Sequence, residues 1–226
     1  MNYKKIMDFR VVKRVATGTE DIKYLDGIQG LNGKRLEALT LDDINELIEF
    51  LQSWNKMRRV DYRDDKVKRR ILEDIKKCTP NFQKLEDKDL LKITLDDLNV
   101  RAIKEIFNIL ANSNVGKSKA RKHGFTGASK IMHIILPQLF VMWDGRIREA
   151  YNCKGNAEGY IKFVQKAKVE AEELMDSWMR WKSKDELWQE LGEDEITLPR
   201  ILDRVNFNLF TDKNRLQIIK QNLCVH

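Results

Sequence analysis

The chain has 226 residues, of which 42% are hydrophobic and 34% are charged, and its net charge is +7. A chain of this length and composition can bury a core, which excludes wholesale disorder. No apolar run approaches the roughly 18 residues of a membrane span, and the charged N-terminal segment lacks the apolar centre of a signal peptide. We therefore expect a cytoplasmic protein without membrane contact and with an anionic partner, of which nucleic acid is the commonest.

The cysteines and histidines form no pattern typical of a metal site. Cys78, Cys153 and Cys224 are scattered and include no C-x-x-C pair. The three histidines also lack the spacing of metal ligands. The sequence therefore predicts reduced thiols, no metal ion and no cofactor.

Turn-forming residues are scarce, with 3 prolines and 11 glycines in the whole chain. Long helices fit this composition better than many short strands, so the predicted fold is mainly α-helical. Two organisations are open. The chain forms either an N-terminal helical lobe over residues 1–97 and a second lobe over residues 98–226 that holds the functional centre, or one compact domain.

The first clear helix is expected to begin near Thr40. Two acids follow this threonine, as is typical of a capped helix start, and apolar residues then recur at helical spacing. The preceding residues 1–36 give no clear element, and Gly27, Gly30 and Gly33 predict a loop.

A second helix is predicted over residues 64–78, and Thr79–Pro80 is expected to end it. The face of this helix opposite its apolar residues is basic, and it contains Lys66, Lys68, Arg69 and Arg70. Such a face is either solvated or binds phosphate groups, and the sequence leaves both interpretations open.

The sequence that follows Thr40 recurs in similar form at Thr94, which predicts a third helix with the same start. This helix is expected to run to about Leu110 with Leu98 in the core. Further along, a long helix is predicted over residues 157–181.

The run Thr197-Leu-Pro-Arg places Pro199 near the start of the last clear helix. Trp178, Trp181 and Trp188 cluster just before it. Tryptophans at helical spacing pack in a core or stack on bases, and the core is the favoured interpretation.

Residues 114–151 contain a basic loop, two glycines three residues apart, an apolar segment, a proline and an aspartate. Gly116-Lys117-Ser118 matches the end of a phosphate-binding loop. That motif also needs a glycine where Ala111 stands, and a strand before it. A nucleotide-binding enzyme of the phosphate-loop class is therefore the least favoured function.

The same region predicts two helices joined by a tight turn. Residues 118–123 would form a short basic helix, Gly124 to Gly127 the turn, and residues 128–136 an apolar helix. Backbone N–H groups at the start of the second helix suit a phosphate, and cations before the turn add positive charge. These cations are Lys117, Lys119, Arg121 and Lys122. The element predicts a nucleic-acid contact, and an ordinary helical connection with a solvated basic face is the alternative.

Two segments of this region form a further pattern. They are Gly124-Phe-Thr-Gly127-Ala-Ser-Lys130 and the later Val141-Met-Trp-Asp144-Gly-Arg-Ile-Arg. Together they resemble the helix-hairpin-helix superfamily of DNA glycosylases and AP lyases. The resemblance covers about 40 residues. It implies a DNA-repair enzyme for abasic or base-damaged double-stranded DNA, with Lys130 as nucleophile and Asp144 as essential carboxylate. With one gap moved, Ser129 takes the place of the lysine. The DNA-binding residues would be Lys117, Lys119, Arg121, Lys122, Gly124, Gly127, Ser129 and Arg146.

The spacing allows Lys130 and Asp144 to meet. Pro137 would end the helix that carries Lys130, about 9 Å beyond it at about 1.5 Å per residue. The following segment, if extended, can span up to roughly 20 Å and bring Asp144 back level with the lysine.

In the implied chemistry, a deprotonated lysine amine attacks the sugar C1′ of an extruded nucleotide, forms a Schiff base and permits β-elimination. A free lysine has a pKa of about 10.4, so desolvation or the nearby cations must lower it. Asp144 would orient the amine or stabilise positive charge on the sugar, or would only cap a helix over residues 145–151. In the alternative interpretation, Lys130 is an ordinary lysine on the solvated surface of a helix. The main alternative for the protein is a non-catalytic helical module that binds DNA or RNA.

Overall fold

The computed structural model describes residues 22–54, 60, 62, 64–115, 122–179 and 197–211. Within these ranges the regular structure is helical, apart from one isolated antiparallel bridge between Asn114 and Lys122. The predicted mainly α-helical fold is confirmed. None of the described helices combines the length and apolar character that crossing a membrane would require.

The helices in chain order are α3 (Ile22–Leu31), α4 (Asn45–Trp54), α5 (Asp65–Gln83), α6 (Asp97–Asn112), α7 (Gly124–Ile135), α8 (Gly145–Ala150), α9 (Ala157–Met179) and α11 (Leu198–Asn206). A short 3-10 turn, η1 (Leu36–Ala38), follows α3, and a π-helical turn, η2 (Phe207–Thr211), follows α11.

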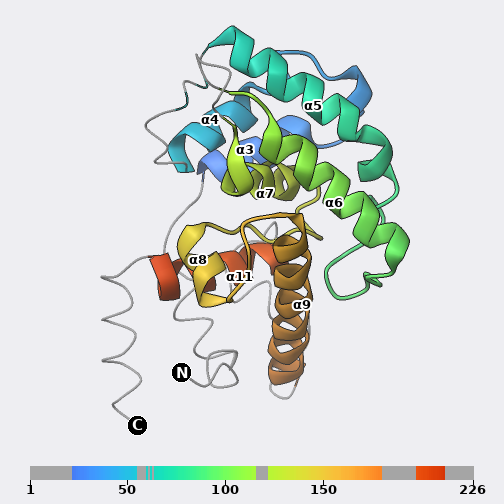
Figure 1. Ribbon diagram of the computed structural model, residues 1–226, viewed down its shortest axis with the longest axis vertical. Helices are drawn as coiled ribbons and strands as arrows, with labels where there is room; N and C mark the ends of the chain where they lie inside the picture. Colours follow the sequence, from blue (N-terminus) through green and yellow to red (C-terminus); the bar gives the residue numbers. More distant parts are fainter. Residues whose placement is uncertain are drawn as a thin grey trace.

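Helices α3 to α7 gather in one group, and α8, α9 and α11 lie together below it in the view of Figure 1. Helix α6 links the two groups because it packs on α5 and α7 as well as on α9. One hydrophobic cluster runs through both groups, from Tyr24 in α3 to Leu209 in η2. The predicted lobe boundary after residue 97 falls in the first turn of α6, and the division into lobes stays a prediction.

Side-chain caps set the starts of several helices. Asp64, Asp144 and Thr197 each accept a hydrogen bond from a backbone N–H in the first turn of α5, α8 and α11, respectively. The predicted place of Pro199 near the start of the last helix is confirmed. The predicted start at Thr40 is displaced, because Thr40 and Asp43 hydrogen-bond each other in a turn that precedes α4.

The cap of α6 is Asp96, two residues beyond the predicted Thr94. Leu98 then lies in the first turn, five residues before the buried Ile103 and therefore about 140° around the helix axis from it. Its side chain is 73% exposed, so the prediction that Leu98 belongs to the core is wrong.

Pro80 does not end α5, which continues to Gln83, so that prediction is also wrong. The proline lacks an N–H, and the carbonyl of Lys76 loses its helical partner as a result. Both residues are on the exposed face of the helix, where water can solvate this carbonyl. Phe82, which is buried, packs the last turn against the core.

Gly27 and Gly30 belong to α3 and not to the predicted loop. The missing side chain of Gly30 lets α3 approach α4 closely, because a Cβ there would lie 3.0 Å from the Cβ of Glu46. A Cβ at Gly27 would make only an ordinary contact, 3.5 Å from the Cβ of Phe50. Gly33, with a φ of 71°, follows the helix and lies in the predicted loop.

The predicted turn from Gly124 to Gly127 is wrong, because these residues form the first turn of α7. Gly124 enters the helix from left-handed backbone, with a φ of 80°. Lys122 bridges to Asn114 and is not helical, and residues 118–121 of the predicted basic helix lie outside the described residues. A helix-hairpin-helix element is therefore not confirmed.

Gly127 makes room for a buried histidine. His123 is 1% exposed, and its Nε2 lies 3.0 Å from the hydroxyl of Tyr62. A Cβ at Gly127 would stand 2.2 Å from the same Nε2. The pair of glycines in this stretch thus has two separate causes, the backbone conformation at Gly124 and side-chain packing at Gly127.

We expect Gly127→Ala to destabilise the protein by about 1–3 kcal/mol, because the methyl group would displace the His123 ring from its place against Tyr62. Urea unfolding followed by circular dichroism measures this change. The matched control is Gly145→Ala at the start of α8, where a Cβ meets nothing within 4 Å. Equal stabilities of the two variants would contradict the packing role of Gly127.

Candidate active site

Helix α7 is buried at every position from Gly127 to Ile134. It packs on α3, α4 and α6. Polar side chains on such a helix must find their partners inside the protein. Three of them, Ser129, Lys130 and His133, organise the candidate site.

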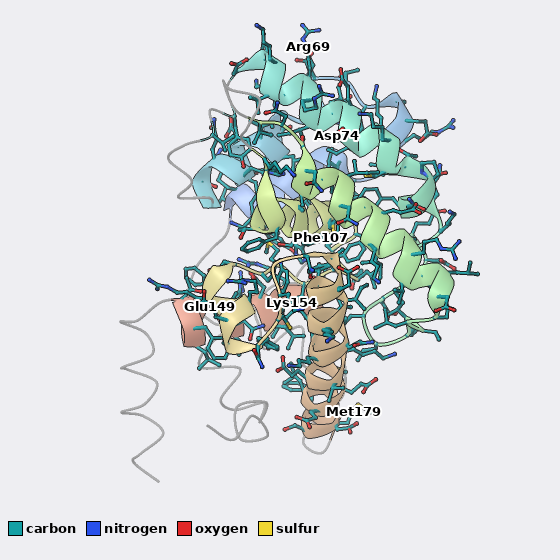
Figure 2. All side chains as sticks on the ribbon, viewed as in Figure 1. Arg69, Asp74, Phe107, Glu149, Lys154 and Met179 are labelled. Carbon is teal, nitrogen blue, oxygen red and sulfur yellow. The ribbon has the colours of Figure 1, made fainter. Side chains whose placement is uncertain are left out.

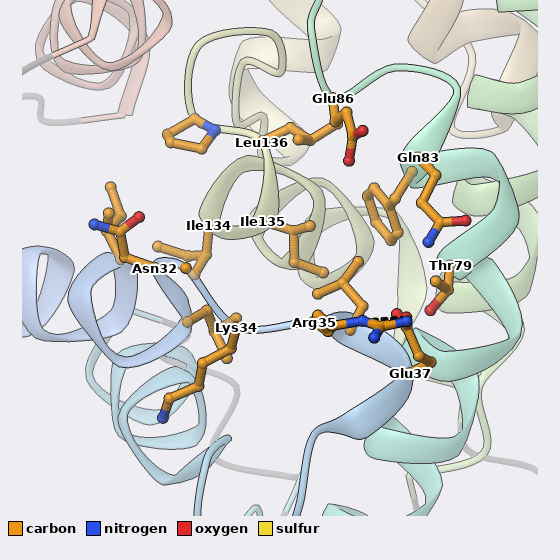
Figure 3. Close-up of a pocket in the computed structure, with 16 residues that line it drawn as sticks. Asn32, Lys34, Arg35, Glu37, Thr79, Gln83, Glu86, Ile134, Ile135 and Leu136 are labelled. Atoms are coloured by element: carbon orange, nitrogen blue, oxygen red, sulfur yellow. Dashed lines mark hydrogen bonds and ion pairs between the residues drawn. The ribbon is translucent and has the colours of Figure 1, made fainter.

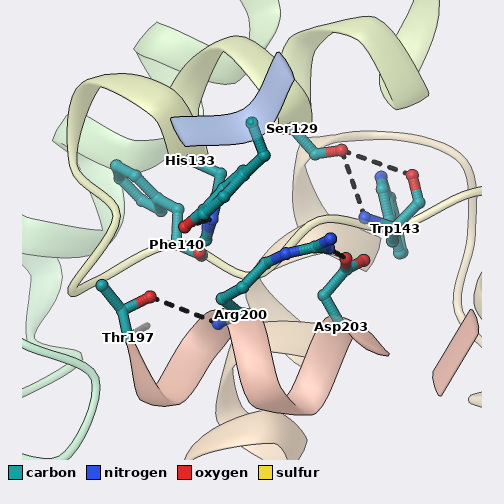
Figure 4. Close-up of polar contacts among 8 residues, drawn as sticks. Ser129, His133, Phe140, Trp143, Thr197, Arg200 and Asp203 are labelled. Carbon is teal, nitrogen blue, oxygen red and sulfur yellow. Dashed lines mark hydrogen bonds and ion pairs between the residues drawn. The ribbon is translucent and has the colours of Figure 1, made fainter. Parts of the chain in front are cut away.

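Ser129 links α7 by hydrogen bonds to the segment after Pro137, which runs back along the helix. Its Oγ accepts a hydrogen bond from the N–H of Trp143 at 3.2 Å, as Figure 4 shows. The hydroxyl proton has two carbonyl acceptors within reach, Thr126 at 3.0 Å and Trp143 at 3.3 Å. This contact brings residue 144 beside the helix position after Ser129. The tryptophan ring is 1% exposed and packs on Phe107, so it belongs to the core.

Asp144 caps α8. Its Oδ1 accepts hydrogen bonds from the N–H groups of Arg146 at 2.8 Å and Ile147 at 2.9 Å. Its Oδ2 accepts a hydrogen bond from the hydroxyl of Thr211 at 2.8 Å. The carboxylate is therefore held in one orientation by α8 and η2.

Lys130 is 7% exposed, so the alternative of a solvated surface lysine is wrong. Burial lowers the pKa of its ammonium group to about 8, while the negative charges of Asp203 and Asp144 limit this fall. Burial accounts for the lowered pKa, and the predicted cations Lys117, Lys119 and Arg121 lie outside the described residues.

Two charged residues of the site were missed by the sequence analysis. Arg200 and Asp203 form an ion pair on α11, and both are buried. The guanidinium of Arg200 lies 4.7 Å from the centre of the Tyr24 ring, and Figure 4 shows it directed toward Asp203. Burial raises the pKa of Asp203, and the charges of Arg200 and Lys130 oppose that rise. The charge of Asp203 therefore acts on both Arg200 and Lys130.

A signal for these residues exists in the sequence of α11. The helix carries Arg200, Asp203, Arg204 and Asn206 among its apolar residues, and all nine of its residues are buried. From the sequence alone, however, three charged residues in one short helix predict a solvated face. Only the packing of α9 and η2 around α11 shows otherwise.

His133 completes the contact between α3, α7 and the returning segment. Its Nδ1 donates to the carbonyl of Phe140, and its Nε2 accepts a hydrogen bond from Tyr24 Oη at 2.9 Å. Burial lowers the pKa of this imidazole to about 4, so the ring is neutral at physiological pH. It therefore supplies two directional hydrogen bonds and no charge.

The other predicted DNA-binding residues lie at different places on the surface and in the interior. Lys122 is exposed and donates to Asn112 Oδ1 at 2.6 Å. Arg146 is exposed and donates to the carbonyl of Thr211 at 2.6 Å, next to Asp144. Ser129 is fully buried, and its hydroxyl bonds within the protein. No group of His, Cys, Asp and Glu side chains among the described residues could hold a metal ion.

Comparison with known proteins finds no match: no family model fits the chain, and neither a curated protein nor a solved structure is significantly similar to it. The resemblance of the central stretch to DNA glycosylases therefore stays a prediction.

We expect Asp203→Asn to lower the pKa of Lys130 below about 8, because the substitution removes a negative charge that favours the ammonium form. Asp144→Asn should also lower the pKa of Lys130, and the amide oxygen of the new asparagine can still cap α8. Reductive ¹³C-methylation of lysines followed by an NMR pH titration measures this pKa. The control is Asp87→Asn, which removes an exposed carboxylate that pairs with Lys88. A rise in the Lys130 pKa, or an equal change in the control, would contradict the assignment.

Proposed function

We propose that this chain is a DNA glycosylase/AP lyase in which the amine of Lys130 attacks C1′ of an abasic or base-damaged nucleotide. The observation that carries the proposal is a buried lysine with a pKa of about 8 in the field of two carboxylates. At pH 7 about a tenth of such an amine is neutral, compared with less than about a thousandth at a pKa of 10.4. A neutral amine is the form that attacks a carbonyl carbon.

In a base-damaged nucleotide, attack of the amine on C1′ would break the glycosidic bond and release the base as the leaving group. The ring-opened sugar of an abasic site presents an aldehyde at C1′. Addition of the Lys130 amine and loss of water would give a protonated imine at this carbon. The imine acidifies the C2′ proton; its loss drives formation of a C2′–C3′ double bond and departure of the 3′ phosphate. Hydrolysis of the imine then returns the free lysine.

The carboxylates of Asp144 and Asp203 suit different roles in this reaction. Both oxygens of Asp144 already accept hydrogen bonds from the α8 backbone and from Thr211. Asp144 is therefore suited to a fixed negative charge that stabilises positive charge on the sugar and the imine. Asp203, whose pKa burial raises, is the better proton acceptor of the two.

The start of α7 supports a contact with the DNA backbone. The helix begins without a side-chain cap, so its first N–H groups have no partner of that kind. Gly124 and the exposed Lys122 lie at this end of the helix, and Arg146 lies beside Asp144. A phosphate group bound at the N-terminal end of α7 would be one to two helical turns from Lys130.

A second candidate function, non-catalytic binding of nucleic acid, is favoured by the outer face of α5. Lys66, Arg69 and Lys76 recur at helical spacing on this face and are exposed, and they make no ion pair with the described residues. Figure 2 shows Arg69 extending from α5 away from the rest of the molecule. A row of exposed cations on one helix face suits a phosphate backbone.

We expect borohydride to trap a covalent complex between this protein and duplex DNA containing an abasic site, because the imine at Lys130 is reducible. Lys130→Ala and Lys130→Arg should lower the trapped yield at least about 100-fold, since neither side chain offers a neutral amine. The yield is measured by gel electrophoresis under denaturing conditions. The matched control is Lys154→Arg, which changes an exposed lysine.

The pH dependence of trapping gives an independent check. The rate should rise with pH up to about 8 and level off above it, because deprotonation of Lys130 makes the nucleophile. A wild-type protein that gives no trapped complex, or a Lys130→Ala variant that traps as well as the wild type, would refute the catalytic proposal.

For the second candidate, we expect the triple variant Lys66→Ser/Arg69→Ser/Lys76→Ser to bind duplex DNA more weakly. The slope of the logarithm of affinity against the logarithm of salt concentration should fall by about 0.9 for each phosphate that the variant no longer neutralises. The control triple variant changes Lys23, Lys88 and Lys92, which already form ion pairs, and removes the same charge. Fluorescence anisotropy of labelled DNA measures both. Equal slopes for the two variants would exclude the α5 face as a binding surface.

A further inference from the structure

Three helices end at one cavity. The last turns of α3, α5 and α7 enclose a volume of about 450 Å³, which Figure 3 shows. Leu31, Phe82 and Ile135 give it apolar walls, one from each helix, and Leu136 continues the wall beyond α7. The volume lies within the roughly 300–1,000 Å³ that is typical of small-molecule sites.

The helix ends contribute negative partial charge to this cavity. Each helix C-terminus carries a partial charge of about −0.5, because its last carbonyl groups point along the axis. Here the C-terminal turns of three helices meet. Glu37 and Glu86 add carboxylates to the lining, and Thr79 and Gln83 add neutral polar groups.

The two cations of the lining already have partners. Lys34 donates to Asp43 Oδ1 at 2.8 Å, and this hydrogen bond is the largest cause of a lowered pKa of the Asp43 carboxyl. Arg35 pairs with Glu37 at 2.6 Å. In Figure 3 the ammonium of Lys34 points away from Gln83 and Glu86.

Glu86 differs from the other charged residues of the lining. It makes no ion pair with any described residue, whereas each of the other charges is neutralised by a neighbour. An anionic ligand would have to displace a carboxylate from Lys34 or Arg35. A cationic ligand would meet an unpaired carboxylate and three helix C-termini.

We propose that this cavity binds a small organic cation, with an ammonium or guanidinium group near Glu86 and an apolar chain against Ile135 and Leu136. The proposal adds a ligand site to a chain whose net charge of +7 would otherwise favour anions. It does not depend on the chemistry of Lys130. Ile135 lies five residues beyond Lys130 and about 140° around the axis of α7, so the two residues face different neighbours.

The test uses hexylamine, hexanol and hexanoate as probes of equal length with positive, neutral and negative head groups. Binding is followed by ¹³C-methyl NMR of Ile135 and Leu136 in the full chain. Hexylammonium should shift these signals saturably, hexanol should bind more weakly, and hexanoate should not bind. This order separates charge recognition from simple filling of an apolar cavity.

Glu86→Gln should weaken hexylammonium binding about twofold to fivefold, since a partly exposed ion pair contributes this much. Glu172→Gln on α9 removes a distant carboxylate and should leave binding unchanged. Ile135→Trp, which fills the cavity, should abolish the shift at Leu136, and thermal unfolding of each variant verifies its fold. Absence of a saturable shift with hexylammonium, equal binding of hexanoate, or a Glu86→Gln variant that binds like the wild type would overturn the proposal. Borohydride trapping by Lys130 is unaffected by any of these results.

Discussion

A central helix that is buried on all sides constrains the rest of this structure. Helix α7 carries Ser129, Lys130 and His133 within a stretch that has almost no contact with solvent. Each unsatisfied polar group there would cost roughly 1–3 kcal/mol, and an unpaired charge would cost more. Ser129 is satisfied by the Trp143 backbone, and His133 by Phe140 and Tyr24. These bonds fix the path of residues 140–143 and the place of α3 against α7. The charge of Lys130 is opposed by that of Asp203, which also pairs with Arg200 on the buried helix α11.

Local chemistry predicted some helix boundaries from the sequence, whereas features that depend on packing were not predictable. Pro199 lies in the first turn of α11, where no N–H is needed, and the end of α7 near Pro137 has an equally local cause. The helix starts predicted at Thr40 and Thr94 were displaced, and Pro80 did not end α5. Gly30 and Gly127 were interpreted as loop or turn residues, yet each makes room for a side chain, that of Glu46 on α4 and that of His123 beside Tyr62, respectively. Such a role appears only when the neighbouring elements are in place.

The candidate site was likewise predictable from the sequence only in part. The return of the chain after Pro137 follows from the length of the segment, so the proximity of residue 144 to α7 could be anticipated. The cause of the lowered Lys130 pKa could not, because it is desolvation by the assembled core rather than neighbouring cations. Arg200 and Asp203 were missed for the same reason. Their burial lowers the pKa of the arginine to about 10 and raises that of the aspartate, so both charges are held at a cost in free energy. Replacement of a buried ion pair by apolar residues of similar volume is often neutral or stabilising, and strongly shifted pKa values occur both at functional sites and in structural ion pairs.

Helix α7 also separates the two sites that we propose. Its middle carries Lys130, and its last turn lines the cavity through Ile134 and Ile135. A ligand in the cavity could influence the lysine only by shifting this helix. Closely packed neighbours along the buried middle of α7 oppose such a shift, because interiors at crystal-like density transmit displacement only by repacking. The carboxylates that set the pKa of Lys130 belong to α11 and to the cap of α8, and neither contributes to the cavity lining. The amine and the cavity are thus built from different partners around one rigid helix, so each can be altered by substitution without altering the other.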